Sequence, residues 1–286
     1  MYPKITWLVE KQVWDEAEEK RLLEALAKTD SDVILYSLGE DVRALKDKVS
    51  RKADGPIIGR GSIQFIKNAD TGIPWAYVSW PEFRCSNYFI PFIDELIHGD
   101  FAFLPWGLLP NMKNSIYNKF KNDQGEIFIR PDTNDKVFSG KVVPFPEFDK
   151  WWKQEEDCYS PPKSLQCVIS RPMGIMEERR YICSVDDCSI LSFSSYKKAD
   201  CWAGEAGCWS GEAGENRVIH DVLEKLKNDP MILGDMPFIV VDMAWTKYGW
   251  FLVEFGSINC CSWYDCDPLP IINAINERER RMWNVE

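Results

Sequence analysis

Hydrophobic and polar positions at the N-terminal end of the chain predict alternating strands and helices. Apolar runs at residues 5–9 and 32–38 are typical of buried strands. The segment 13–28 between them places four apolar residues on one helical face: Leu22, Leu23, Leu26 and Ala27. Strand, helix and strand at this spacing predict a βαβ unit and hence a parallel sheet. Residues 55–65 indicate a further strand that enters a helix capped by Ser62.

The pattern changes after residue 100. The aromatic and proline-rich stretch 100–110 favours a connector, and a short helix follows at 112–121. Periodic segments predict further strands and a helix, at 126–130, 165–170, 179–183, 190–193, 215–227 (the helix), 238–243 and 250–254. The turn Lys247-Tyr248-Gly249 joins the last two strands, and Asp267 followed by Pro268 begins a final helix. We expect an α/β protein with two domains, residues 1–104 and 105–286.

Composition restricts the class of protein. Hydrophobic residues make up 45% and charged residues 28% of the 286 residues, which is a globular profile. The net charge of −11 argues against a broad electrostatic surface for nucleic acid or anionic lipid, although a local basic pocket stays open. The first eleven residues lack a signal-peptide core, and no apolar run approaches the ~20 residues of a membrane span. We therefore expect a cytoplasmic protein that makes no membrane contact.

The sequence offers little for histidine-dependent or cysteine-dependent chemistry. His98 and His220 are the two histidines, and no G-x-S-x-G or H-E-x-x-H motif occurs. The ten cysteines form no C-x-x-C pair, so reduced thiols are favoured over a metal centre or disulfides. Gly59-Arg60-Gly61 lacks the remainder of a phosphate-binding motif and favours a turn.

Two acidic residues close apolar runs near the C-terminal end. Asp242 ends FIVVD and Glu254 ends WFLVE, so both carboxylates are expected at the same edge of a sheet. Two buried carboxylates need a compensating cation, and Mg²⁺ is held by a few carboxylate oxygens, water and phosphates. Solvated strand ends beside turns are the alternative reading.

A basic segment precedes them. Arg130 ends an apolar strand, and Lys136 lies in the following small-residue loop with Ser139 and Gly140. Cations beside such a loop can hold a triphosphate. A solvated, charged turn is the alternative.

Three segments together resemble an ATP-grasp domain, and they are most similar to a phage-associated clade of that superfamily. They are FIRPDTNDKVFSG, VISRPMGIMEERRYIC and FIVVDMAWTKYGWFLVEFGSIN. In that clade a strand ends in Lys/Arg-Pro, a Lys-x-Phe-x-Gly loop follows, and a Glu-x-Arg strand precedes an Asp strand and a Glu strand. The resemblance covers about residues 100–270. It implies an ATP-grasp fold of two α+β lobes, preceded by a small parallel βαβ domain.

The resemblance also implies roles for individual residues. It places Arg130, Lys136 and Lys113 on the ATP phosphates, and Ile169 with Ser170 at the hinge segment against adenine. Glu178 and Arg180 match the Glu-x-Arg motif, and the arginine suits an acyl-phosphate or γ-phosphate. Asp242 and Glu254 would carry Mg²⁺. The usual motif is Glu-x-Asn, but Gly256 stands two residues after Glu254, so Asn259 is expected to supply the missing oxygen.

The activity implied is that of an ATP- and Mg²⁺-dependent carboxylate–amine ligase with an acyl-phosphate intermediate. Its carboxylate and amine substrates would be small molecules, a peptide or a protein, in the host cytoplasm if the protein is phage-encoded. A small-molecule kinase on the same fold and a nucleotide-binding protein without turnover are the alternatives. The tandem repeat CWAGEAG-CWSGEAG at residues 201–214 predicts an irregular loop, either a lid over the substrate or a surface extension.

Overall fold

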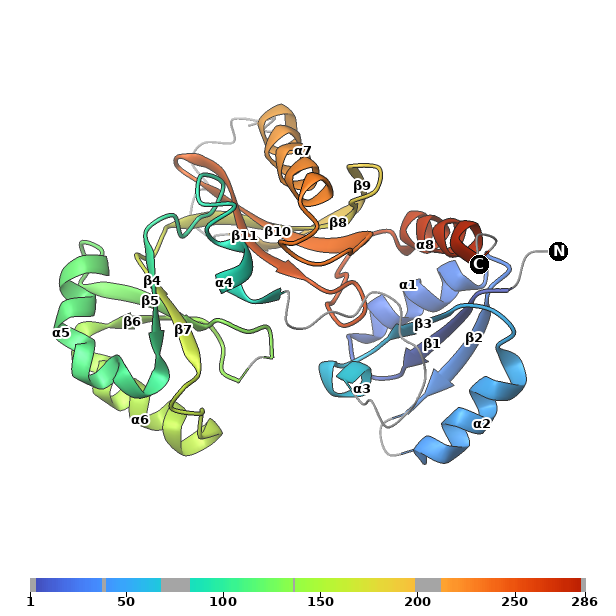
Figure 1. The fold of residues 1–286 in the computed structure, drawn as a ribbon, viewed down its shortest axis with the longest axis horizontal. Helices are drawn as coiled ribbons and strands as arrows, with labels where there is room; N and C mark the ends of the chain where they lie inside the picture. The colour runs from blue at the N-terminus through green and yellow to red at the C-terminus, as the bar shows by residue number, and fades with distance from the viewer. Residues whose placement is uncertain (1–3, 38–39, 68–82, 136, 199–211, 284–286) are drawn as a thin grey trace.

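The structure is a computed structural model that describes residues 4–37, 40–67, 83–135, 137–198 and 212–283. Within these residues the longer strands form three sheets, which lie in a row in Figure 1. The first, the N-terminal sheet, is parallel and has the order β2-β1-β3. Its strands are β1 (Thr6–Glu10), β2 (Asp32–Tyr36) and β3 (Ile57–Arg60). The predicted parallel βαβ unit is confirmed.

Three helices lie beside this sheet: α1 (Glu16–Leu26), α2 (Val42–Lys52) and α3 (Ile63–Lys67). Asp15 caps α1 by accepting a hydrogen bond from the Glu18 amide at 2.8 Å. Ser62 caps α3 in the same way, with the Phe65 amide 3.1 Å from its hydroxyl, so the predicted cap is confirmed. Gly59 and Arg60 belong to β3 rather than to the predicted turn, because they pair with Leu8 and Val9 of β1.

The second sheet is antiparallel and has the order β4-β7-β5-β6. It consists of β4 (Phe101–Pro105), β7 (Gln166–Ser170), β5 (Glu126–Pro131) and β6 (Lys141–Pro144). Together with α5 (Leu109–Phe120) and α6 (Phe148–Tyr159) it encloses a core of its own, and we call this unit lobe A. The predicted connector at residues 100–110 is wrong: residues 101–105 pair with β7, and the following residues enter α5 through a 3-10 turn.

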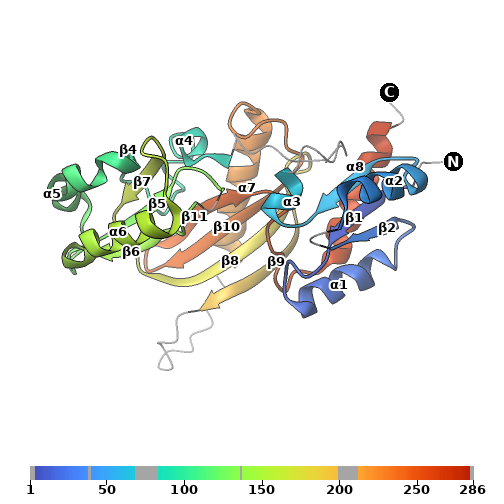
Figure 2. The same cartoon turned by 90° about the horizontal axis from the view of Figure 1, so that it is seen from below.

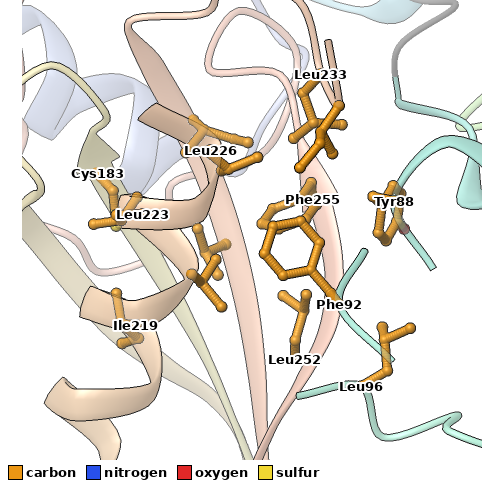
Figure 3. Packing of buried hydrophobic residues seen from close by; sticks show 14 of the residues in the cluster. Tyr88, Phe92, Leu96, Cys183, Ile219, Leu223, Leu226, Leu233, Leu252 and Phe255 are labelled. Atoms are coloured by element: carbon orange, nitrogen blue, oxygen red, sulfur yellow. The ribbon is translucent and has the colours of Figure 1, made fainter. Parts of the chain in front are cut away.

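The third sheet is also antiparallel and has the order β11-β10-β8-β9. Its strands are β11 (Gly249–Gly256), β10 (Phe238–Thr246), β8 (Ile175–Ser184) and β9 (Ser189–Lys198). Helix α7 (Glu212–Asn228) covers one face through Ile219, Leu223 and Leu226 (Figure 3), and we call sheet and helix lobe B. The segment α4 (Cys85–Tyr88) and the residues after it pack against the same core. Residues 201–211 of the repeat lie outside the described residues, and residues 212–214 belong to α7 rather than to a loop.

The last helix, α8 (Pro268–Trp283), joins lobe B to the N-terminal sheet (Figures 1 and 2). Ile271, Ile272 and Ile275 of α8 share one buried cluster with Trp7 of β1 and Val240 of β10. Asn276 accepts a hydrogen bond from the Trp7 indole at 3.0 Å. The boundary at residue 104 stays a prediction, but residues on both sides of it build this cluster. Among the described helices, none is both long and apolar enough to cross a membrane.

Candidate functional site

A pocket opens between lobe A and lobe B. Its walls come from the end of β5 and the loop after it, from the centre of the lobe B sheet, and from the loop 257–264. The lining side chains include Arg130, Asn134, Arg180, Asp242, Glu254, Cys261 and Tyr264. Four of the residues predicted from sequence, Arg130, Arg180, Asp242 and Glu254, therefore meet in one place.

The floor of the pocket is a polar row across three strands of lobe B. Asp242 on β10 lies directly opposite Arg180 on β8 and opposite Glu254 on β11. Directly opposed residues of neighbouring strands project from the same face of a sheet. Arg180 binds Asp242 with two parallel contacts, Nε to Oδ1 at 2.8 Å and Nη2 to Oδ2 at 2.7 Å. Its remaining nitrogen, Nη1, donates to the Ser262 carbonyl at 2.8 Å, so the loop 257–264 is bound to the row.

Two contacts connect the row to lobe A. Arg130 Nη1 lies 2.7 Å from Glu254 Oε2, and this ion pair joins β5 to β11. In the loop after β5, Asn134 Nδ2 donates to the Phe255 carbonyl at 2.8 Å. In this arrangement each candidate metal-binding carboxylate is neutralised by an arginine that is itself a candidate phosphate ligand.

Burial controls the charges in the row. Burial raises the pKa of Asp242 to about 6; Arg180 counteracts this rise, whereas the charges of Glu254 and Glu178 add to it. Burial alone would lower the pKa of Arg180, but its contacts with Asp242 outweigh that effect and raise it. A guanidinium stays protonated at any physiological pH. We conclude that both members of the Arg180–Asp242 pair are charged at neutral pH.

The carboxylates are suited to a divalent cation. Mg²⁺ in nucleotide sites is typically held by one or two carboxylates together with phosphate oxygens and water. Asp242 and Glu254 supply two such groups on one face of adjacent strands. Over the described part of the chain, no three His, Cys, Asp or Glu side chains are grouped closely enough to hold a metal by themselves. The residues therefore fit a cation that shares its coordination with a nucleotide.

An aromatic wall stands beside Arg180. Tyr196 and Tyr264 stack with ring centroids 4.7 Å apart, and the Arg180 guanidinium lies 4.8 Å from the Tyr264 ring and 5.4 Å from the Tyr196 ring. The Tyr196 hydroxyl donates to Glu178 Oε2 at 2.8 Å. The predicted residue Glu178 thus lies two positions before Arg180 on the same face of β8, and it is tied to this wall.

Three other predicted residues are not among those that line this pocket. Ile169 and Ser170 are buried in β7, where the Ser170 hydroxyl is 2.8 Å from His98 Nδ1. Lys113 lies on α5 and pairs with Asp149 at 2.8 Å. Lys136 lies outside the described residues.

Asn259 is buried where the loop 257–264 meets the N-terminal sheet. Its Nδ2 donates to the Gly59 carbonyl at 2.6 Å, and its Oδ1 accepts from the Ser257 hydroxyl at 3.2 Å. In this structure the Asn259 amide holds the loop on β3.

Sequence reasoning missed the residues that shape this loop. Arg60 donates from Nη1 to the carbonyls of Ile258 at 2.8 Å and Cys261 at 2.7 Å. Cys260 and Cys261 line the pocket as adjacent thiols. A hydrogen bond with the Cys260 thiol lowers the pKa of Cys261; burial opposes that shift, and Arg180 supports it. The repeated cysteines near residue 260 were a visible signal, but their place beside Glu254 depends on the fold.

Comparison with known proteins identifies the class to which this architecture belongs. The structure is similar to D-cycloserine synthetase DcsG, with a TM-score of 0.62, 11% identity and coverage of 96% of this chain and 99% of that one. It is also similar to the D-alanine–D-alanine ligase of Bacillus anthracis complexed with ATP, with a TM-score of 0.61, 14% identity and coverage of 99% and 98%. The VanG D-Ala:D-Ser ligase of Enterococcus faecalis gives a TM-score of 0.51 at 12% identity, with coverage of 95% of both chains.

These similarities concern the fold, and a family model identifies an ATP-grasp protein. A family model for the ATP-grasp domain, family 3 of the R(2)K clade, matches residues 108–275, which is more than half of the chain. The chain belongs to this family of ATP-grasp domains. Comparison with curated proteins gives no significant match.

Proposed function

We propose that this protein is an ATP- and Mg²⁺-dependent ligase that joins a carboxylate to an amine through an acyl phosphate. The observation that carries the proposal is the row Arg180–Asp242–Glu254, which faces Arg130 across the pocket between the lobes. Two carboxylates and two guanidinium groups in one pocket of an ATP-grasp fold suit a bound triphosphate with its cation. The ligase neighbours support the choice of reaction.

The chain's own residues would position and neutralise the reactants. Arg130 and Lys136 would bind phosphate oxygens, and Asp242 with Glu254 would hold Mg²⁺. The bound cation would supply neutralisation of the phosphate charge. For this, both arginines must leave the carboxylates that they contact in this structure, and each is then free to bind an anion. Arg180 would contact the phosphoryl group, and Tyr196 with Tyr264 would limit the acceptor side of the pocket.

The proposed reaction is balanced in two steps. A carboxylate oxygen of the substrate attacks the γ-phosphorus of ATP, which forms an acyl phosphate and breaks the bond to ADP. The amine then attacks the acyl carbon, inorganic phosphate leaves, and the amine loses a proton as the amide forms. Reactions of this type need positioning and charge stabilisation more than a protein nucleophile. That requirement agrees with a site built from arginines and carboxylates.

The test is to incubate the full chain with ATP, Mg²⁺ and mixtures of amino acids and short peptides. We expect ADP formation that depends on both an acid and an amine, with a new amide found by mass spectrometry. Asp242→Asn and Glu254→Gln keep the side-chain shape and should each reduce ADP formation at least ~100-fold. The exposed Asp157 on α6 offers a matched control, and Asp157→Asn should retain the full rate.

The remaining outcomes separate the alternatives. ADP formation that needs no amine, with a stable phosphorylated product, would identify a kinase. ATP binding without any ADP formation would identify a binding protein, the reading that Gly256 in place of the motif asparagine favours. Wild-type turnover in Glu254→Gln would remove the carboxylates from the mechanism.

A further inference from the structure

The residue that departs from the ATP-grasp metal motif has a sulfur atom beside it. Gly256 follows Glu254 by two residues on β11, so a side chain at position 256 would project from the same face as the Glu254 carboxylate. A Cβ atom at Gly256 would lie 2.5 Å from Cys261 Sγ, which is closer than real Cβ contacts. The thiol of Cys261 therefore fills the space of a side chain at position 256.

The backbone around Cys261 is fixed on two sides. Its amide donates to the Ser257 carbonyl at 3.1 Å, and its own carbonyl accepts from Arg60 at 2.7 Å. The loop is bound to the row as well, through Arg180 and the Ser262 carbonyl. Since Gly256 has no side chain, the sulfur reaches the carboxylate face of the sheet, and it lines the same pocket as Asp242 and Glu254.

We infer that Cys261 supplies the third protein ligand of the metal site, in the place that the motif asparagine would occupy. This inference rests on the proposed function. The donor set is then two carboxylates and a thiolate, whereas the usual motif offers oxygen atoms alone. Thiolate ligands favour softer cations, and Mg²⁺ prefers oxygen. The site would accept thiophilic divalent ions such as Zn²⁺ or Cd²⁺ with ATP more readily than an all-oxygen site does.

Two features of the structure agree with a site that forms with the nucleotide. The carboxylates are occupied by Arg130 and Arg180, so the three donors converge only after these ion pairs open. Binding of the cation replaces the thiol proton, which passes to solvent. Asn259, the oxygen donor expected from sequence, is engaged with Gly59 and Ser257 and is not among the residues that line the pocket.

The experiment uses Cd²⁺ as the probe, because a cadmium–thiolate bond has its own ultraviolet charge-transfer absorption. The full chain is titrated with Cd²⁺ in the presence and absence of ATP, and the ATP-dependent absorption is recorded. We expect one saturable ATP-dependent increment in the wild-type protein. Cys261→Ser should abolish the absorption and weaken ATP-dependent Cd²⁺ binding by at least the ~10- to 100-fold known for disturbed metal sites. Cys158→Ser, at an exposed thiol on α6 that does not line the pocket, should keep both.

A second variant is designed to change the metal preference of the site from a thiophilic cation to Mg²⁺, so its test does not depend on a loss of binding. Gly256→Asn combined with Cys261→Ala restores an oxygen donor at position 256 and removes the sulfur that blocks it. This variant should bind Mg²⁺ with ATP more tightly than Cd²⁺, as measured by calorimetry. An unchanged absorption in Cys261→Ser, or an unchanged metal preference in the double variant, would overturn the thiolate ligand and mean that the sulfur only fills space.

The control for the underlying proposal is ATP binding in the presence of Mg²⁺ by the wild-type protein. No binding of ATP by calorimetry would reject the proposed function itself. Binding of Mg²⁺ and ATP without the cadmium signature would reject the role of Cys261 alone.

Discussion

Arg60, the last residue of β3, is buried and donates to carbonyls of the loop 257–264, so its replacement gives a strong test of how this loop is held. Its side chain is 1% exposed and pairs with Glu18 at 2.9 Å. The guanidinium lies between the rings of Trp14 and Trp263, 4.1 and 4.0 Å from their centroids. Burial lowers the pKa of Arg60 to about 10, against the raising effect of Glu18, so the group is charged at neutral pH.

Arg60→Met removes the charge and keeps much of the side-chain volume. The Glu18 carboxylate then loses its cation, and the carbonyls of Ile258 and Cys261 lose their donor. Removal of one partner from a buried ion pair typically costs ~3–5 kcal/mol. Glu18 keeps hydrogen bonds from the Trp263 amide and the Ser262 hydroxyl, so we expect the lower end, about 3 kcal/mol. For a chain of this size that corresponds to a melting temperature lower by roughly 5 °C.

The free energy of unfolding is measured by urea titration, followed by circular dichroism. Arg217→Met on α7 is the matched control, because the Arg217 side chain is 84% exposed, and the change should stay within about 0.5 kcal/mol. Glu18→Gln completes a double-mutant cycle with Arg60→Met, in which the two losses should be clearly less than additive. An Arg60→Met protein as stable as the control, or fully additive losses, would refute the reasoning.

Other residues give outcomes that separate measurements can check. The pKa of His98 is lowered to about 3 by burial and then by the charge of Arg130, so the native state keeps this ring neutral while the unfolded chain protonates it near pH 6.5. The free energy of unfolding should therefore fall as the pH drops below 6.5, by about 3 kcal/mol at pH 4. In urea titrations, His98→Gln should remove this dependence of the unfolding free energy on pH, whereas His220→Gln, at an exposed histidine, should keep it. An equal pH dependence in the wild-type protein and both variants would contradict the argument. Lys136→Ala should weaken ATP binding in calorimetry by about ten- to a hundredfold without unfolding the protein. Lys141→Ala, on the exposed start of β6, should leave the affinity for ATP unchanged. An unchanged affinity in Lys136→Ala would remove Lys136 from the site. Ser62→Ala should destabilise the protein by about 1 kcal/mol through the lost cap of α3, and no change in the unfolding midpoint would show that the cap is unimportant.

Local periodicity was sufficient for the N-terminal sheet and for most of lobe B. Residues 5–9 and 32–38 have the length and apolar character of parallel strands, and the structure places β1 and β2 there. It was insufficient where pairing with a distant strand decides or where few residues of a helix are buried. Residues 101–105 form β4 because β7 lies beside them, a partner more than sixty residues away. Helix α6 was missed, and only two of its residues, Phe148 and Trp151, are buried.

The acidic and basic residues of the site were found from their positions at strand ends, but their arrangement was not. Asp242 does not end its strand: β10 continues to Thr246, and the two carboxylates meet because the hairpin register puts Asp242 opposite Glu254. Their arginine partners come from β8 and β5, and no local pattern links those strands to β10. The space taken by Cys261 beside Gly256 depends on a loop conformation that sequence spacing does not specify.

The position of α8 affects how the chain can fold during synthesis. Trp7 of the first strand is buried against Ile271, Ile272 and Ile275, which the ribosome makes more than 260 residues later. Until then the face of the N-terminal sheet that carries Trp7 is covered by α1 but lacks α8, although its strands can already pair. Contacts of such long sequence separation slow folding, and they leave apolar surface available to chaperones in the meantime. The N-terminal sheet should therefore reach its native stability only after α8 has left the ribosome, although its strands are made before both lobes.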